Sequence, residues 1–162
     1  MKYWVASDYH FGHKNKMIEL CQRPPNYEYL IIKNLSCIPD DDCLIFLGDY
    51  CFGRDMFYHS LMSGFSFKKI YIKGNHCPKS YSWYMDHGWD FACETMTLHI
   101  YGKRIIFSHK PIELAGHDLN VHGHVHNKDP KELAESLCVT PGHVLVKSEH
   151  TYRPQLLRSL VR

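Results

Sequence analysis

The residues best suited to chemistry in this chain are its histidines and the polar residues beside them. Histidine, a common metal ligand and proton carrier, makes up 13 of the 162 residues. The first three polar clusters along the chain each follow a short apolar run that predicts a strand. They are Asp8-Tyr9-His10, Gly48-Asp49 and Gly74-Asn75-His76. Ligands of α/β proteins bind outside the carboxyl ends of the strands. Core packing does not require polar, metal-binding side chains at three successive strand ends. These clusters therefore predict a binding site.

Two later clusters add to this set. Phe107-Ser108-His109 ends one predicted strand, and Asn120–His126 ends another. In an extended segment, residues two apart face the same way, so His122, His124 and His126 can converge, as can Asp8 and His10. Each cluster alone is a weak signal, but five clusters at predicted strand ends are hard to obtain from solvated loops.

Three glycines accompany these clusters. Gly123 removes a side chain between two histidine rings, and Gly48 and Gly74 let backbone segments approach closely. Other histidines have no informative spacing and are expected at the surface: His59, His87, His99, His117, His143 and His150.

The elements that must position these clusters alternate between strands and helices in the first half of the chain. Strands are predicted over 3–7, 43–47 and 69–72, and helices over 14–22, 27–38, 55–62 and 80–87. From Thr95 onward strands dominate. A turn at Gly102-Lys103 joins 97–101 to 104–107, further strands cover 118–122 and 143–147, and a closing helix covers 153–162. We expect one domain, 1–162, built as an α/β sandwich around one or two mixed sheets.

Composition and charge exclude other classes of protein. The chain is 44% hydrophobic and 22% charged, as globular proteins are, and its net charge of +2 without a block of like charges indicates no nucleic-acid groove. No apolar run approaches the roughly 18–20 residues that a membrane span needs, and Asp8 interrupts the first run too early for a signal peptide. The seven cysteines form no CxxC pair, so we expect reduced thiols in a cytoplasmic protein.

Taken together, the clusters resemble those of the calcineurin-like metallophosphoesterases of the small, single-domain type. The matching blocks are Asp8-x-His10, Gly48-Asp49, Gly74-Asn75-His76, His109 and Gly123-His124-Val125-His126. The opening Ser7–His13 and the late Tyr152-Arg153-Pro154 also resemble compact bacterial and phage members. The resemblance spans essentially the whole chain. It implies a four-layer α/β/β/α sandwich of two mixed β-sheets flanked by helices.

The resemblance also implies two divalent metal ions in one pocket. The implied ligands are Asp8, His10 and His126 for the first ion and Asn75, His109 and His124 for the second, with Asp49 as the bridge. His76 would protonate the leaving oxygen or stabilise its charge. Imidazole and carboxylate ligands suit manganese, which we favour, and also iron, zinc or nickel. A bridging carboxylate holds two cations at ~3.5–4 Å, where both stabilise an in-line displacement.

The expected activity is hydrolysis of a small phosphodiester, such as a nucleotide or cyclic nucleotide, by a metal-bridging hydroxide. Two divalent cations opposed by Asp8, Asp49 and the hydroxide keep a positive charge, which a singly charged diester neutralises. Arg54 could bind a phosphate, and His13 flanks the mouth of the site. Three alternatives stay open: a phosphomonoesterase or nuclease on the same site, a non-catalytic metal-binding module, and a small structural zinc protein.

Some positions depart from the family pattern. Many relatives have an acidic residue after Gly-Asn-His, but Cys77-Pro78 follows here, which leaves His76 without a usual orienting partner. Tyr50–Arg54 stands where protein phosphatases have Asp-Arg, so that activity is not expected. His122 is expected to lie behind the ligands rather than among them. The aromatic residues at 81, 83, 84 and 89 are expected in the core rather than stacked on a base.

Overall fold

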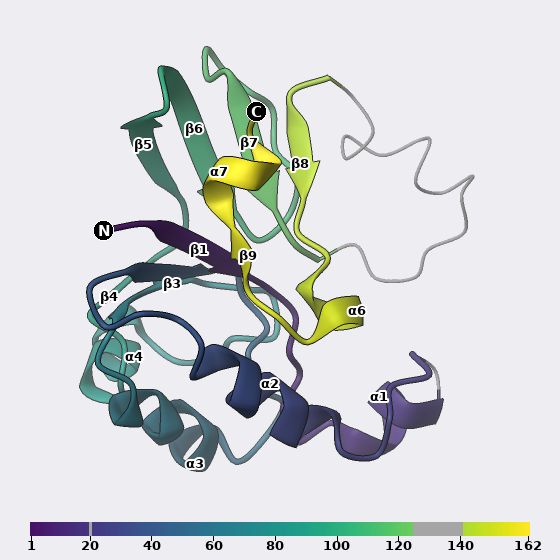
Figure 1. Ribbon diagram of the computed structural model, residues 1–162. Coiled ribbons are helices and arrows are strands. Elements are labelled where there is room, and N and C mark those ends of the chain that lie inside the picture. The colour runs from purple at the N-terminus through teal and green to yellow at the C-terminus, as the bar shows by residue number, and fades with distance from the viewer. Residues whose placement is uncertain (20, 125–140) are drawn as a thin grey trace.

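Two β-sheets form the framework of the protein. A computed structural model describes residues 1–19, 21–124 and 141–162. The larger sheet holds five strands in the order β4 (Phe91–Cys93), β3 (Lys68–Ile72), β2 (Cys43–Phe46), β1 (Tyr3–Ala6) and β9 (Gln155–Leu156). The smaller sheet holds β5 (Met96–Ile100), β6 (Lys103–Ser108), β7 (Leu119–His122) and β8 (His143–Leu145). Strands β1 to β4 are parallel, as are β6 to β8, whereas β9 and β5 run antiparallel to β1 and β6. Both sheets are therefore mixed, as predicted (Figure 1).

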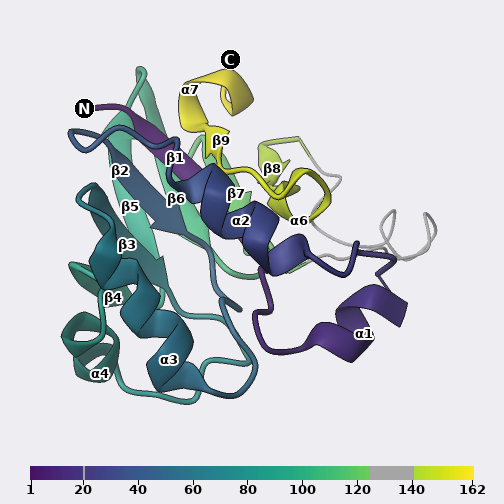
Figure 2. The same cartoon turned by 60° about the horizontal axis from the view of Figure 1, so that its bottom comes forward.

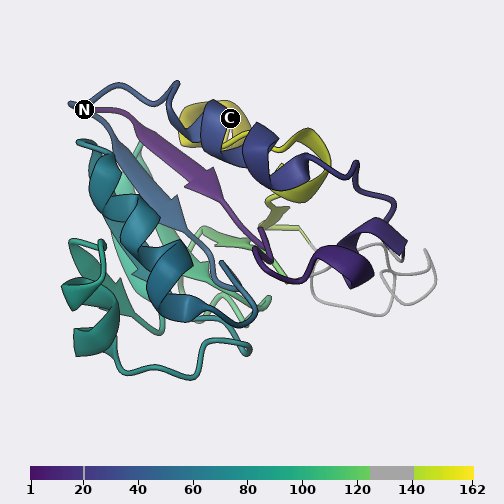
Figure 3. The same cartoon turned by 90° about the horizontal axis from the view of Figure 1, so that it is seen from below.

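Helices cover the outer face of the five-stranded sheet. The helices that contribute to the core on this face are α1 (Lys14–Glu19), α2 (Tyr27–Leu35), α3 (Asp55–Ser60), the 3₁₀ turn η1 (Leu61–Gly64) and α4 (Tyr81–Asp86). Two short helices follow later in the chain, α6 (Ser148–Thr151) and α7 (Leu157–Leu160), and Leu157 of α7 belongs to the core between the sheets. Figures 2 and 3 show α2 and α3 in front of this sheet and the strands of the smaller sheet behind it. The loop 109–118 contacts the smaller sheet, where the Ile112 amide donates to Asn120 and the His117 ring meets the Thr97 hydroxyl at 2.9 Å. The predicted α/β sandwich is confirmed.

The apolar core has two parts, one on each face of the five-stranded sheet. Leu44 and Phe46 of β2 face the helices, whereas Ile45 and the following Leu47 face the smaller sheet. Side chains alternate along a strand, so a strand buried on both faces needs apolar residues at every position. This is why 43–47 reads as an unbroken apolar run. None of the helices in the described part of the chain is long and apolar enough to cross a membrane.

Most predicted elements form within a few residues of their expected bounds, and the hairpin shows why the bounds shift. The two-residue turn between β5 and β6 is Tyr101-Gly102, because Ile100 pairs with Lys103. Both turn residues have positive φ, 56° and 72°, as a turn matched to the strand twist requires. Lys103 therefore belongs to β6 and not to the turn.

The closing helix predicted over 153–162 is wrong in its first half. Gln155 and Leu156 form the edge strand β9, which pairs with Val5 and Trp4 of β1, and only 157–160 is helical. Pairing satisfies the backbone groups that β1 would otherwise expose at the sheet edge. The short elements β4 and α6 were also not predicted.

Candidate metal centre

The carboxyl ends of five strands bring the predicted clusters together. Asp8 and Asp49 follow β1 and β2, Asn75 follows β3, and His109 and His124 follow β6 and β7. Backbone bonds tie these loops to one another: Asp8 N donates to Gly48 O at 3.1 Å, and Gly123 N donates to His109 O at 3.0 Å. The clusters expected to converge from distant parts of the sequence therefore lie at one end of the sandwich.

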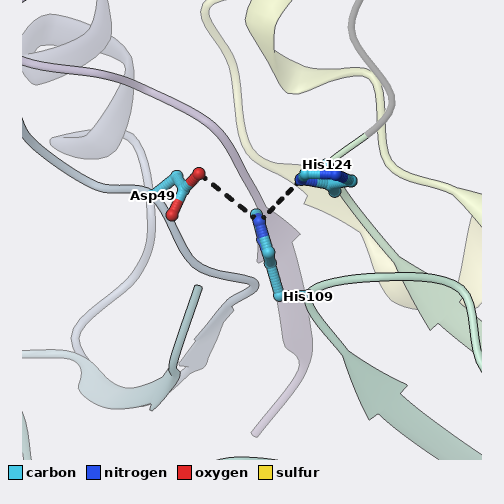
Figure 4. A group of neighbouring side chains, drawn as sticks. All are labelled: Asp49, His109 and His124. Carbon is cyan, nitrogen blue, oxygen red and sulfur yellow. Dashed lines mark hydrogen bonds and ion pairs between the residues drawn. The ribbon is translucent and has the colours of Figure 1, made fainter. Parts of the chain in front are cut away.

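One group of ligand-type side chains consists of Asp49, His109 and His124 (Figure 4). The Nε2 atom of His109 lies 3.4 Å from Oδ2 of Asp49, 3.1 Å from Nδ1 of His124 and 2.9 Å from Oδ1 of Asn75. The other ring nitrogen of His109 lies 2.7 Å from the carbonyl oxygen of Leu47. A carbonyl only accepts, so Nδ1 carries the proton and Nε2 of the neutral ring has its lone pair toward the group.

This arrangement fits a cation. Metal-bound histidines usually donate their second ring N–H to a carbonyl or carboxylate, as His109 does to Leu47. The four atoms Nε2 of His109, Nδ1 of His124, Oδ1 of Asn75 and Oδ2 of Asp49 all offer lone pairs within a few ångströms. Oδ2 of Asp49 is buried and has no hydrogen-bond partner among the described residues. Nitrogen and oxygen donors of these types suit first-row divalent metals.

A second group of ligand-type side chains consists of Asp8, His10 and Asp49. Nε2 of His10 lies 3.8 Å from Oδ1 of Asp8, and both side chains are buried. The Oδ2 atom of Asp8 accepts hydrogen bonds from the Ser7 hydroxyl and from the His124 amide. Asp49 belongs to both groups, so one buried carboxylate joins them. His126, the remaining expected ligand, lies outside the described residues.

Electrostatics favour an ionised Asp49 beside His109. Burial alone would raise the pKa of Asp49, but the His109 ring and the His76 amide outweigh burial and hold the pKa below its usual value. Burial alone would lower the pKa of His109, but Asp49 and Asp8 outweigh it and raise the pKa. The two carboxylates thus favour positive charge at this place, which a metal ion would also supply.

Four residues of this centre have left-handed backbone conformations. The φ angles are 58° for Asp8, 51° for His10, 54° for Asp49 and 68° for His124. Such conformations are rare for residues other than glycine and persist only where the surrounding structure holds them. Here the loops are held so that several side chains point into one place.

Two of the glycines make room for the carboxylates. A Cβ on Gly74 would collide with Oδ1 of Asp49 and come within 2.6 Å of the Asp49 amide nitrogen. The close approach predicted for Gly74 is therefore confirmed. The reason expected for Gly123 is wrong. A Cβ there would collide with the Ser7 hydroxyl and come within 2.5 Å of Oδ2 of Asp8, so Gly123 gives space to β1's loop rather than to histidine rings.

Residues that sequence reasoning missed hold the Asp8–His10 loop. The buried Arg23 donates from Nη1 to the Tyr9 carbonyl at 2.6 Å and from Nη2 to the Asp8 carbonyl at 2.9 Å. The Tyr27 hydroxyl donates to the His10 carbonyl at 3.1 Å. These contacts span 14 to 17 positions of the chain and follow no periodic pattern, so no local signal marks them.

His76 and Cys77 point in different directions. The His76 ring is exposed, with its centroid 6.1 Å from the His10 ring and 5.5 Å from the Phe52 ring. Cys77 is buried, where its sulfur lies 2.9 Å from the Tyr71 hydroxyl and donates to Oδ1 of Asp49 at 3.6 Å. Cys77 therefore supports the shared carboxylate rather than His76.

The two expected substrate contacts lie in different places. The His13 ring stacks on Phe52 with centroids 4.3 Å apart and lies 6.1 Å from the His10 ring, beside the centre. The Arg54 guanidinium lies over the Phe57 ring at 4.5 Å and lines a separate cavity of about 840 Å³ between α3 and α4. The structure thus brings His13, but not Arg54, next to the ligand-type groups.

His59 is a correction, because it is buried rather than at the surface. Its Nδ1 accepts a hydrogen bond from Trp89 Nε1 at 2.8 Å, and burial lowers its pKa to about 3. Its ring lies near Cys51 and Asp55, a third set of ligand types. The bond from Trp89 uses the one lone pair of the neutral ring, so this set does not offer three donors to a metal.

The remaining predictions concern His122, the aromatic residues and the cysteines. His122 is fully buried with Nδ1 3.0 Å from the Gly123 carbonyl, and it belongs to neither group of ligand-type side chains. Trp89 and Tyr84 are buried in the core, whereas Tyr81 is 40% exposed. The six cysteines in the described part of the chain are free thiols.

Comparison with known proteins identifies the fold. No protein-family model and no curated protein matches the chain. Among solved structures, a protein of unknown function from Aquifex aeolicus is similar, with a TM-score of 0.75 and 24% identity over 98% of this chain and 96% of that one. A novel archaeal phosphodiesterase is similar with a TM-score of 0.50 and 18% identity, over 80% and 76% of the two chains. At these identities the likeness establishes a shared fold.

Proposed function

We propose that the chain is a metal-dependent phosphoesterase of the calcineurin-like type, and that it hydrolyses a small phosphodiester such as a nucleotide or cyclic nucleotide. One observation carries the proposal: the two groups of ligand-type side chains share Asp49. A carboxylate common to two ligand sets is what a two-metal phosphoesterase requires. The archaeal protein that shares the fold is itself a phosphodiesterase.

The ligand assignment follows the two groups. Asn75, His109 and His124 would hold one ion, Asp8 and His10 with His126 would hold the other, and Asp49 would bind both. Manganese is our first choice, and iron, zinc or nickel suit the same donors. Two bound divalent cations would lower the pKa of a water molecule and stabilise charge on the phosphoryl oxygens.

The chain's own residues then have distinct tasks. Asp49, held ionised, and Asp8 supply negative charge that two divalent cations exceed, so the centre attracts an anionic phosphoryl group. His76 is exposed, and its ring lies beside His10 while its backbone N–H is fixed at 3.0 Å from Oδ1 of Asp49. It can therefore reach a bound ester from the solvent side and give a proton to the departing alcohol.

The test begins with metal content and two substrates. Protein stripped with EDTA should not hydrolyse bis(p-nitrophenyl) phosphate, and Mn²⁺ should restore turnover with two ions bound per chain. The diester should be hydrolysed faster than p-nitrophenyl phosphate, since a singly charged ester matches the centre. A large monoester preference would indicate a monoesterase instead. Two bound ions without turnover of either ester would indicate a non-catalytic module, and one ion would indicate a structural site.

A further inference from the structure

A second pocket adjoins the candidate metal centre on the side of Asn75 and His109. It measures about 290 Å³, and its charged wall consists of Lys73, Glu94 and Lys110. We call this group, with Asn75 and His109, the lysine pocket. Because two of the proposed ligands line it, a phosphoryl group at the centre would have one of its ester arms within reach of the pocket.

Both lysines leave well-fixed backbone. Lys73 directly follows β3, and its amide donates to the Cys93 carbonyl at 2.9 Å. The Lys110 carbonyl accepts a hydrogen bond of 2.6 Å from the Ser108 hydroxyl. That hydroxyl in turn accepts from the buried Asn120 side chain at 2.8 Å. The pocket is therefore built on strand ends and not on a freely moving loop.

The positive charge of the pocket is not neutralised within the described part of the chain. The ion pairs of lysine found there join Lys68 and Lys69 to Asp90, and none involves Lys73 or Lys110. Lys73 lies 5.5 Å from the Tyr81 ring, whose hydroxyl donates to Glu94 at 3.0 Å. The pocket lining thus carries two lysines and one carboxylate, and that carboxylate already accepts a hydrogen bond.

We propose that the lysine pocket binds a second anionic group, a phosphate, carried on one arm of the phosphodiester substrate. The inference rests on the proposed function, because it assigns the substrate class of the same centre. Two lysines beside a phosphodiester site favour a substrate with a second anionic group over one with a neutral arm, and they disfavour a cationic arm. A phosphorylated nucleoside ester has the required chemistry.

The test compares two esters that differ only in that phosphate. Thymidine 5′-(p-nitrophenyl phosphate) and its 3′-phosphate have the same leaving group, so the bond broken is the same. In the Mn²⁺-loaded protein we expect kcat/KM to be about tenfold higher for the 3′-phosphorylated ester. Each lysine should contribute roughly threefold, the range of partly exposed ion pairs. Lys73→Gln and Lys110→Gln should therefore each lower the ratio of the two kcat/KM values about threefold.

Two further variants test whether the ratio of the two kcat/KM values follows the charge of the lysine pocket. Glu94→Gln should raise the ratio, because it removes a negative charge from the wall. Lys103→Gln, at the hairpin end of β6, should leave the ratio unchanged because Lys103 lines a different surface. Calorimetry measures binding without turnover. Thymidine 3′,5′-bisphosphate should bind more tightly than thymidine 5′-monophosphate, and this difference in affinity should be smaller in the Lys73 and Lys110 variants.

The outcomes separate this inference from the proposed function. If bis(p-nitrophenyl) phosphate is hydrolysed but the two thymidine esters react equally, the lysine pocket does not select a second phosphate. A preference that persists when both lysines are replaced would also overturn the inference. If no ester is hydrolysed, the proposed function fails and this inference fails with it.

Discussion

The backbone amide of His124 donates a hydrogen bond of 2.8 Å to Oδ2 of Asp8, across 116 positions of the chain. Asp8 follows β1 of the five-stranded sheet and His124 follows β7 of the four-stranded sheet. Both residues have positive φ, 58° and 68°. The bond therefore joins the carboxyl ends of the two sheets, and the geometry of the candidate centre depends on how the sheets pack.

Gly123→Ala should disrupt this junction. The added Cβ would meet the Ser7 hydroxyl and Oδ2 of Asp8, so the loop must move away and Asp8 loses its bond to His124. We expect unfolding free energy to fall by ~1–3 kcal/mol, as for overpacked sites, with weaker Mn²⁺ binding by calorimetry. Gly64→Ala is the matched control, because a Cβ there meets nothing within 4 Å. Equal behaviour of the two variants would contradict the structure.

Replacement of the shared carboxylate should affect the binding of both metal ions, whereas replacement of an unshared ligand should affect one. Asp49 belongs to both ligand groups, whereas His10 belongs to one. We expect Asp49→Asn to weaken the binding of both ions and to abolish hydrolysis. His10→Ala should weaken the binding of one ion and leave the binding of the other unchanged. Metal analysis after dialysis gives the stoichiometry. Retention of both ions at wild-type affinity in Asp49→Asn would remove Asp49 as the bridge.

His76→Ala should separate metal binding from turnover. The His76 ring is exposed and belongs to neither ligand group, so both ions should stay bound. The rate on a diester with an alcohol leaving group should fall ~10²–10⁴-fold, the usual range for general acid catalysis. The loss should be smaller for bis(p-nitrophenyl) phosphate, because its acidic phenol leaves with little need of protonation. Near-normal kinetics on the alcohol ester would exclude His76 from proton transfer.

The parts of the centre that lie in short motifs could be predicted from the sequence, because a strand end and the two or three residues after it stay together in the fold. Asp8, Asp49 and His109 are of this kind. Arg23 could not be predicted, since its role arises from loops 14 and 15 positions away. His59 was misjudged for the same reason, because the aromatic rings around it, such as Tyr84 and Trp89, come from other parts of the sequence.

Arg23→Met should test the support of the Asp8–His10 loop. Methionine fills similar space but leaves the carbonyls of Asp8 and Tyr9 without their donor inside the protein. Unpaired buried groups cost about 1–3 kcal/mol each, so we expect a loss of ~2–4 kcal/mol in denaturant unfolding and weaker metal binding. Arg158→Met, at an exposed arginine, should change neither. If Arg23→Met matches that control, the two bonds do not stabilise the loop.

The pH dependence of stability should reveal the buried His59. Burial lowers its pKa from 6.5 to about 3 in the folded protein, so the unfolded chain binds more protons between those values. Stability from keeping this ring neutral is therefore complete above pH 6.5 and is lost as the pH falls. The slope should approach ~1.4 kcal/mol per pH unit for one group.

His59→Asn isolates this effect because asparagine offers Trp89 an oxygen acceptor but does not titrate. Between pH 6 and pH 4, the unfolding free energy of the metal-free wild type should fall more steeply than that of His59→Asn, by about 1 kcal/mol per pH unit. Other titrating groups are common to both proteins and cancel in the difference. His99→Asn, at an exposed ring, should follow the wild type. Parallel curves for wild type and His59→Asn would show that His59 is protonated in the fold, and that its bond from Trp89 does not form.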